Sequence, residues 1–201
     1  MTRYSISQPV TQVEAPRLVS GKGKFTDDII LPQQAVGVFL RSPHAHADIV
    51  GIDTARAASL PGVLAILTGE DYAADELGVV RGISPLKKRD GSPMYRPPRP
   101  ALTRDRARHV GQSVALVIAE TLNQAKDAAE AIKIDYTPLP AFFSTATANK
   151  GEAPVLWDDC PNNEPVFAQH GDKDAVDAAL ASAPHVIRGT FVVNRVAANT
   201  M

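Results

Sequence analysis

The sequence predicts an α+β fold, in which helices pack on a mixed β-sheet. Twice along the chain, a strand-like run of branched apolar residues is followed by a helical pattern and a second strand, over residues 48–67 and again over residues 114–136. The run 114–119 is apolar at every position, which is typical of a strand covered on both faces. This repeated order indicates either a weak internal duplication or the commonest way of covering a sheet, and the second explanation is the simpler one.

The first of these modules is preceded by one further strand, expected over residues 36–41. The module itself is expected to contain a strand over 48–52, a short helix ending at Leu60 and a buried strand over 63–67. Asp53 or Thr54 can cap the helix, because a side-chain oxygen there accepts a hydrogen bond from a free backbone amide. Pro61 and Gly62 end it, since proline clashes with the preceding turn and glycine tolerates a positive φ.

The second module carries the stronger helix signals. Thr121 and Gln124 form the pattern of a capping box, in which two side chains satisfy backbone amides at the start of a helix. The apolar residues expected on one face of this helix are Leu122, Ala125, Ala129 and Ile132. After the helix, Ile134 and Tyr136 alternate with charged residues, which predicts a half-buried strand.

The remaining segments set the domain boundaries. We expect an extended arm over 1–19, a first domain over 20–144, a polar linker over 145–171 and the start of a second domain over 172–201. Within that last segment, Asp172 can cap a helix over 173–183. Residues 185–196 then predict a strand, because branched and aromatic residues recur along them.

Composition excludes several classes of protein. The 201 residues contain 21 Lys and Arg against 22 Asp and Glu, a net charge of -1, so the chain as a whole is not a polyanion binder. Cys160 is the single cysteine, which excludes an internal disulfide and a metal site built from cysteines alone. Neither a signal peptide nor an apolar run near the ~20 residues of a membrane span is present, which indicates a cytoplasmic protein.

The segment 81–108 departs from this neutral balance. It carries five prolines, and nine basic residues against Asp90 and Asp105 give it a local charge of +7. Clustered Lys and Arg can bind phosphate groups, so a stand-alone module that uses this loop on nucleic acid or other anionic partners is the alternative function. Tyr95 is the only aromatic residue of the loop, too few for a base-stacking platform. A solvated or partner-contacting loop is therefore the expectation.

His44 and His46 form the pair most similar to a metal site. Two imidazoles at this spacing can share a metal ion, but a site needs a third ligand, and Asp48 is the only carboxylate nearby. We therefore expect structural or hydrogen-bonding roles for both histidines, at a turn between two strands.

The other reactive residue types are expected to be structural as well. Cys160 lies in the polar linker with no base that would activate its thiol, so it is expected to be inert. Surface or capping roles are expected for the acidic residues Asp27, Asp28 and Glu120. The segment from Gly21 to Gly23 is too short for a phosphate-binding loop. We therefore assign no catalytic, cofactor-binding or metal-binding residue to the chain.

Four motifs, in this order and spacing, resemble the molybdenum hydroxylases: RSPHAHA (41–47), LPGVLAILTG (60–69), HVGQSVALVIAET (109–121), and AA (128–129) followed by IDYTPLP (134–140). That family includes xanthine dehydrogenase, aldehyde oxidase and aerobic carbon monoxide dehydrogenase. The resembling part runs from Arg17 to Met201 and is similar to the a/b hammerhead domain that opens the molybdopterin-binding large subunit. GTF (189–191) and NRVAANTM (194–201) resemble the first segment of the molybdopterin-binding region itself. Gln112 stands where many members of the family have glutamate.

The resemblance implies that the parent enzyme is a molybdenum-dependent oxidoreductase, either a hydroxylase or a CO dehydrogenase. Its electrons would pass through two [2Fe–2S] clusters to FAD, and the short arm leads us to expect these cofactors on a small iron–sulfur subunit and a medium FAD subunit. A dimer of such heterotrimers is the expected assembly. The catalytic glutamate and the pterin-binding residues of the family match no position here. We therefore expect a structural and docking portion, not catalytic by itself, that contacts the remainder of the large subunit and both other subunits.

Overall fold

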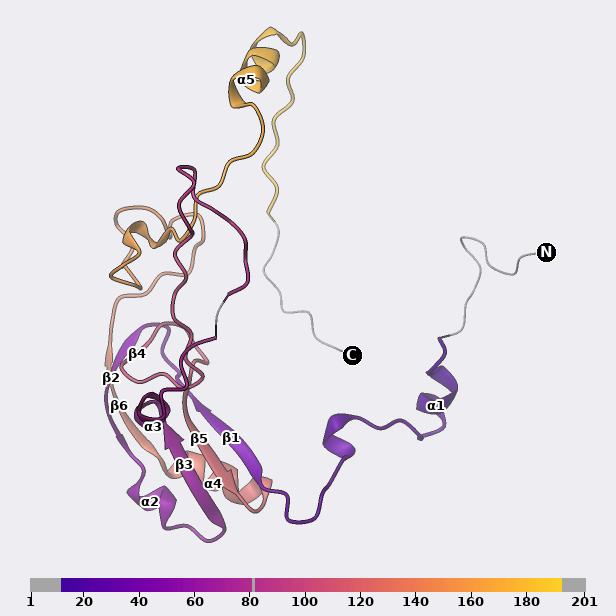
Figure 1. Ribbon diagram of the computed structural model, residues 1–201, viewed down its shortest axis with the longest axis vertical. Coiled ribbons are helices and arrows are strands. Elements are labelled where there is room, and N and C mark those ends of the chain that lie inside the picture. The colour runs from indigo at the N-terminus through magenta and orange to yellow at the C-terminus, as the bar shows by residue number, and fades with distance from the viewer. Residues whose placement is uncertain (1–11, 81, 193–201) are drawn as a thin grey trace, which may run out of the picture. The chain divides into compact units, whose positions relative to one another are not determined.

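The computed structural model describes residues 12–80 and 82–192, and within them the chain divides into two compact units (Figure 1). The larger unit lies within residues 12–82 and 97–163, and the smaller one within 83–96 and 164–192. The elements of the larger unit are α1 (Ala15–Val19), β1 (Val36–Arg41), β2 (Ala47–Asp53), α2 (Ala55–Ala58), β3 (Val63–Thr68), α3 (Gly69–Ala74), β4 (Arg106–Ala107), β5 (Ser113–Ala119), α4 (Leu122–Ala131) and β6 (Lys133–Pro138), with 3-10 turns at Thr26–Asp28 and Pro161–Asn163.

The six strands form two three-stranded sheets. One has the order β1-β5-β3 and the other β4-β2-β6, and every pair among the described strands is antiparallel. Packing of helices on sheets confirms the α+β class. The strands, which were predicted to form one mixed sheet, are instead divided between two antiparallel sheets. The change of sheet occurs after β1, where the segment 42–46 carries the chain away so that β2 pairs with β6 instead of β1.

The core lies between α4 and one face of the sheet β1-β5-β3. Three alanines of α4, at positions 125, 128 and 129, pack against alternate residues of the central strand, Ala115, Val117 and Ala119. Small side chains on both surfaces let helix and sheet approach closely. The predicted helix is confirmed, but Leu122 lies 47% exposed at its first turn, and Ala128 is buried instead.

The opposite face of the same sheet carries a row of large apolar side chains. Phe39 of β1 and Leu67 of β3 both lie directly opposite Leu116 of β5, so the three side chains point to one face. Phe39 is 44% exposed and Leu67 is 38% exposed. We call this set the open row.

Two helices of the larger unit, α3 and α4, begin with side-chain caps. The Thr121 Oγ1 accepts a hydrogen bond from the Gln124 amide, which confirms one half of the predicted capping box. The other half is not formed, because the Gln124 Oε1 accepts from the Thr121 hydroxyl at 2.8 Å instead of from the Thr121 backbone amide. Helix α3 was not predicted, although Thr68 and Asp71 cap each other reciprocally. The hydrogen bond from the Thr68 side chain lowers the pKa of Asp71. The pattern Thr68-x-x-Asp71 is the sequence signal that could have identified this helix.

The smaller unit contains helix α5 (Lys173–Ser182), which confirms the predicted helix and its Asp172 cap, where Asp172 Oδ1 accepts from the Ala175 amide at 2.9 Å. The strand predicted over 185–196 is wrong for residues 185–192, which form no strand, and residues 193–196 lie outside the described part of the chain. A strand needs a neighbour for its backbone groups, and the apolar pattern alone does not supply one. No helix within the described residues has the length and apolar character needed to cross a bilayer.

Candidate functional site

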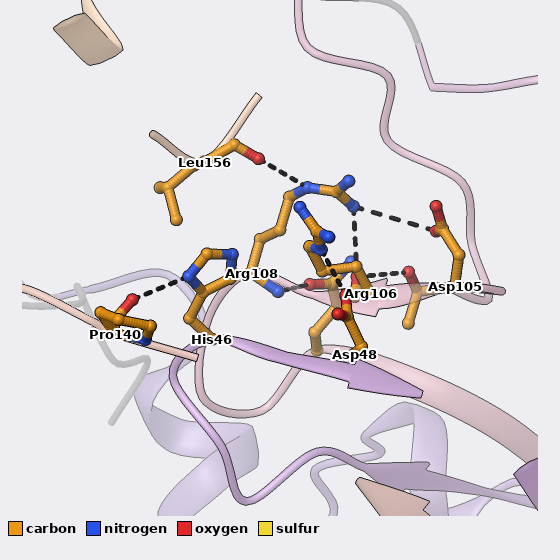
Figure 2. A network of polar contacts seen from close by, with 9 residues as sticks. His46, Asp48, Asp105, Arg106, Arg108, Pro140 and Leu156 are labelled. Carbon is orange, nitrogen blue, oxygen red and sulfur yellow. Dashed lines mark hydrogen bonds and ion pairs between the residues drawn. The ribbon is translucent and has the colours of Figure 1, made fainter. Parts of the chain in front are cut away.

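Strand β4 brings two arginines of the basic loop onto the second sheet. Asp48 of β2 lies opposite Arg106 of β4, and the Arg106 Nε donates to the Asp48 Oδ1 at 2.5 Å (Figure 2). This hydrogen bond raises the pKa of the Arg106 guanidinium above its usual value. Because the two side chains are 29% and 38% exposed, solvent screens much of the attraction, and the pair mainly fixes the position of β4.

Arg108 makes the most extensive set of contacts. Its Nε donates to the Leu156 carbonyl at 2.9 Å and its Nη1 to the Arg106 carbonyl at 3.2 Å (Figure 2). Its guanidinium also lies 3.9 Å from the centre of the Trp157 ring, within the range of a cation–π contact. The side chain is only 15% exposed. Arg108 therefore attaches the segment around Trp157 to the second sheet.

The segment that Arg108 holds is organised by Asn163. The Asn163 Nδ2 donates to the carbonyls of Ala148 and Pro154, both at 3.0 Å, and its Oδ1 accepts from the Leu156 amide at 2.9 Å. Residues 148–163, which belong to the segment expected to be a linker, thus form an ordered loop within the larger unit.

His44 and His46 have separate partners. The His46 side chain is 5% exposed, and its Nδ1 lies 2.8 Å from the Pro140 carbonyl, to which it donates (Figure 2). The His44 ring instead packs at a tilt on Tyr136, with ring centres 4.8 Å apart. Burial raises the pKa of the Tyr136 hydroxyl. Within the described residues, no three His, Cys, Asp or Glu side chains form a group that could hold a metal ion.

The other residues considered from the sequence are dispersed. Asp28 caps a 3-10 turn through a 2.9 Å hydrogen bond from the Phe25 amide, as a capping role requires. Glu120 is exposed, and Cys160 is buried at 4% exposure. The basic loop divides between the two units, because residues 83–96 belong to the smaller unit and 97–108 to the larger one. These positions do not converge on a common site.

A cavity of about 490 Å³ opens in the larger unit beside Trp157. Its polar wall is formed by Arg41, Arg99, Arg108, His109 and Gln112, and prolines 97, 98 and 100 contribute apolar surface. No Asp or Glu is among its lining residues, so the cavity concentrates positive charge. Sequence analysis did not find this site, because its residues come from three distant regions of the chain, at Arg41, within 97–113 and at 156–157.

Two antiparallel three-stranded sheets, one of which is covered on one face by α4, define an α+β domain. The chain matches the family described as "Aldehyde oxidase and xanthine dehydrogenase, a/b hammerhead domain" over residues 20–140. The chain therefore belongs to this family of molybdenum-dependent oxidoreductases, and residues 20–140 are its hammerhead domain. The fold and family implied by the four sequence motifs are both confirmed.

Individual relatives agree with this assignment. The chain is 33% identical to the carbon monoxide dehydrogenase large chain of Afipia carboxidovorans, over 92% of this chain and 23% of that protein. It is also 33% identical to the nicotine 6-hydroxylase large subunit of Paenarthrobacter nicotinovorans, over 100% of this chain and 24% of the relative. The chain thus spans about a quarter of the length of these relatives.

Solved structures show the same fold. The Cu,Mo-CO dehydrogenase in its carbon monoxide reduced state matches with a TM-score of 0.70 and 32% identity, over 88% of this chain and 22% of that one. Quinoline 2-oxidoreductase from Pseudomonas putida 86 matches with a TM-score of 0.64 and 36% identity, over 72% and 18%. None of these comparisons supports a stand-alone nucleic-acid-binding module.

Proposed function

We propose that this chain is the structural and docking portion of the large subunit of a molybdenum-dependent oxidoreductase, and that it is not catalytic by itself. The parent enzyme would act in the cytoplasm on a small molecule, as a hydroxylase or a CO dehydrogenase. The proposal is supported by the side chains of the described residues, among which no three His, Cys, Asp or Glu form a group that could hold a metal ion. We therefore assign molybdopterin to the remainder of the large subunit, and the [2Fe–2S] clusters and FAD to partner subunits.

The open row is the observation that carries this proposal. Phe39, Leu116 and Leu67 form a contiguous apolar strip on the sheet face opposite α4. Burying such side chains contributes about 1.5–3 kcal/mol each, so a water-exposed strip of this kind favours association with another surface. The relatives are about four times as long as this chain, and they supply the occupant that we propose, namely the remainder of the large subunit.

Activity assays test the first half of the proposal. The purified chain should turn over neither CO, xanthine nor an aldehyde, and it should retain no molybdenum after desalting. Turnover of any of these substrates by the chain alone would contradict the proposal.

A complementation experiment tests the docking role. The carbon monoxide dehydrogenase large chain of Afipia carboxidovorans, without the quarter that matches this chain, should bind this chain when both are produced together. Leu67→Asp should weaken that binding at least tenfold, because it places a charge in the strip. Val50→Asp is the matched control, since Val50 is 70% exposed on the other sheet and should leave binding unchanged. Equal binding by both variants would show that the open row is not the contact.

A further inference from the structure

The cavity beside Trp157 has donors that the fold does not use. Arg41 donates through its Nη1 to the Gly111 carbonyl at 2.9 Å and to the Ser113 Oγ at 3.3 Å, and its guanidinium lies 5.6 Å from the centre of the Phe39 ring. Its Nε and Nη2 have no hydrogen-bond partner among the described residues. The exposed Arg99 side chain likewise has no hydrogen-bond or ion-pair partner within the described part of the chain. Two guanidinium groups at the same cavity therefore keep free donors.

Gln112 adds a neutral donor to the wall. The Gln112 Oε1 accepts from the Arg108 amide at 2.6 Å, which leaves the Gln112 Nε2 available to donate. The His109 Nδ1 donates to the Val110 carbonyl at 3.0 Å, so the Nε2 of the neutral ring is an acceptor and adds no donor to the wall. Arg108 adds charge, and two of its donor atoms, Nε and Nη1, are used by the Leu156 and Arg106 carbonyls.

Negative charge close to the cavity is limited. Asp105 is not among the lining residues, but it lies 4.0 Å from the Arg108 Nη1 and is the acidic partner of that guanidinium. Arg41 and Arg99 have no such partner. An anion that enters the cavity would therefore meet uncompensated guanidinium groups, which bind carboxylate and phosphate oxygens through paired N–H donors.

We propose that this cavity is an oxyanion-binding site, which takes a phosphate or carboxylate group on Arg41 and Arg99 with Trp157 and the prolines as its apolar wall. The site adjoins the open row, because the Arg41 guanidinium lies 5.6 Å from the centre of the Phe39 ring, but it does not require the docking role proposed above. The anion has two possible sources, a free small anion or a carboxylate side chain of a neighbouring polypeptide, and the same chemistry recognises both.

Trp157 provides the measurement. It is the single tryptophan of the sequence, and it lines the cavity, so its fluorescence reports on occupancy of this site. The purified 201-residue chain is titrated in two arms, with inorganic phosphate and with a blocked triglutamate peptide, both at constant ionic strength maintained with chloride. A saturable change in emission is expected in at least one arm, and the responding arm identifies the source.

Three variants make the test specific. Arg99→Gln and Arg41→Gln should each weaken binding about tenfold, which is the size expected for losing a charge-assisted hydrogen bond. Gln112→Glu should also weaken it, because it keeps the acceptor for the Arg108 amide but adds a negative charge to the wall. Arg56→Gln removes the same charge from α2, outside the cavity, and should bind as the parent chain does. Circular dichroism verifies that each variant is folded.

The proposal is overturned by either of two results. One is the absence of a saturable response to both phosphate and the peptide. The other is a response that Arg99→Gln, Arg41→Gln and Gln112→Glu leave unchanged while all remain folded, because binding would then lie elsewhere.

Discussion

The guanidinium of Arg108 lies 3.9 Å from the centre of the Trp157 ring, although Arg108 lies within the hammerhead domain and Trp157 follows it in the sequence. Arg108 follows β4, whereas Trp157 lies in the loop that Asn163 organises. Their contact fixes a loop onto a sheet without any strand pairing between them. The attachment of this loop to the sheet therefore depends on one side chain, that of Arg108, and not on a series of backbone hydrogen bonds between strands.

Replacing Arg108 should consequently destabilise the larger unit. We expect Arg108→Met to lower the free energy of unfolding by about 2 kcal/mol, because it removes the ring contact and leaves the Leu156 carbonyl without its donor. Urea denaturation followed by circular dichroism measures the change. Arg104→Met is the control: Arg104 pairs with Glu70 on the surface, at 61% and 69% exposure, and its loss should cost less than about 1 kcal/mol. Equal effects of the two variants would contradict the role given to Arg108.

Gly69 occupies a position where no side chain fits. A Cβ at Gly69 would lie 2.3 Å from the carbonyl oxygen of Thr103, which is backbone and cannot move aside independently. We expect Gly69→Ala to destabilise the domain by about 3 kcal/mol through overpacking. Gly151, which has nothing within 4 Å of a built Cβ, supplies the matched variant, and Gly151→Ala should change the stability by less than about 0.5 kcal/mol. Thermal unfolding of both variants compares the two sites.

The cap of α4 should contribute measurably, since this helix covers the core. Thr121→Ala removes the acceptor for the Gln124 amide and is expected to cost about 1 kcal/mol in the free energy of unfolding. Thr121→Ser retains the hydroxyl and should restore most of that loss. A serine variant as unstable as the alanine variant would indicate that the threonine methyl group, and not the cap, is responsible.

Tyr136 makes stability depend on alkaline pH. Burial raises the pKa of its hydroxyl above the ordinary 10.0, so the folded state holds the proton more tightly than the unfolded state. The corresponding stability is fully present below pH 10 and is lost as the pH rises through the higher pKa of the folded state. Chemical denaturation at pH 9 and at pH values above 10 should show a steeper decline for the parent chain than for Tyr136→Phe. Identical pH profiles would contradict this assignment.

Local patterns were sufficient for most of the elements. Alternation and apolar runs located β1 over its observed range of 36–41, and the cap at Thr121 located α4. They did not distinguish one sheet from two, because the apolar pattern of β2 is compatible with pairing to β1 or to β6. The strand predicted after residue 185 shows the same limit, since a strand depends on a partner that a local pattern does not identify.

The sites were harder to predict than the elements. Arg106 and Asp48 are 58 residues apart, and Arg108 and Leu156 are 48 apart. Within segment 81–108 these arginines looked like part of a solvated charge cluster, since neither composition nor spacing marks which of nine basic residues packs against a tryptophan. The four family motifs predicted the fold because they are typical of one family and therefore of its domain structure. The cavity was not predicted, because its side chains come together only in the folded chain.

The open row also determines how readily the newly made chain aggregates. Phe39 and Leu67 lie on β1 and β3, which are the two outer strands of their sheet, so exposed apolar surface coincides with strand edges that can recruit another chain. Aggregation of the chain should therefore start at this sheet. A chaperone that protects the newly made chain would act most effectively by binding there.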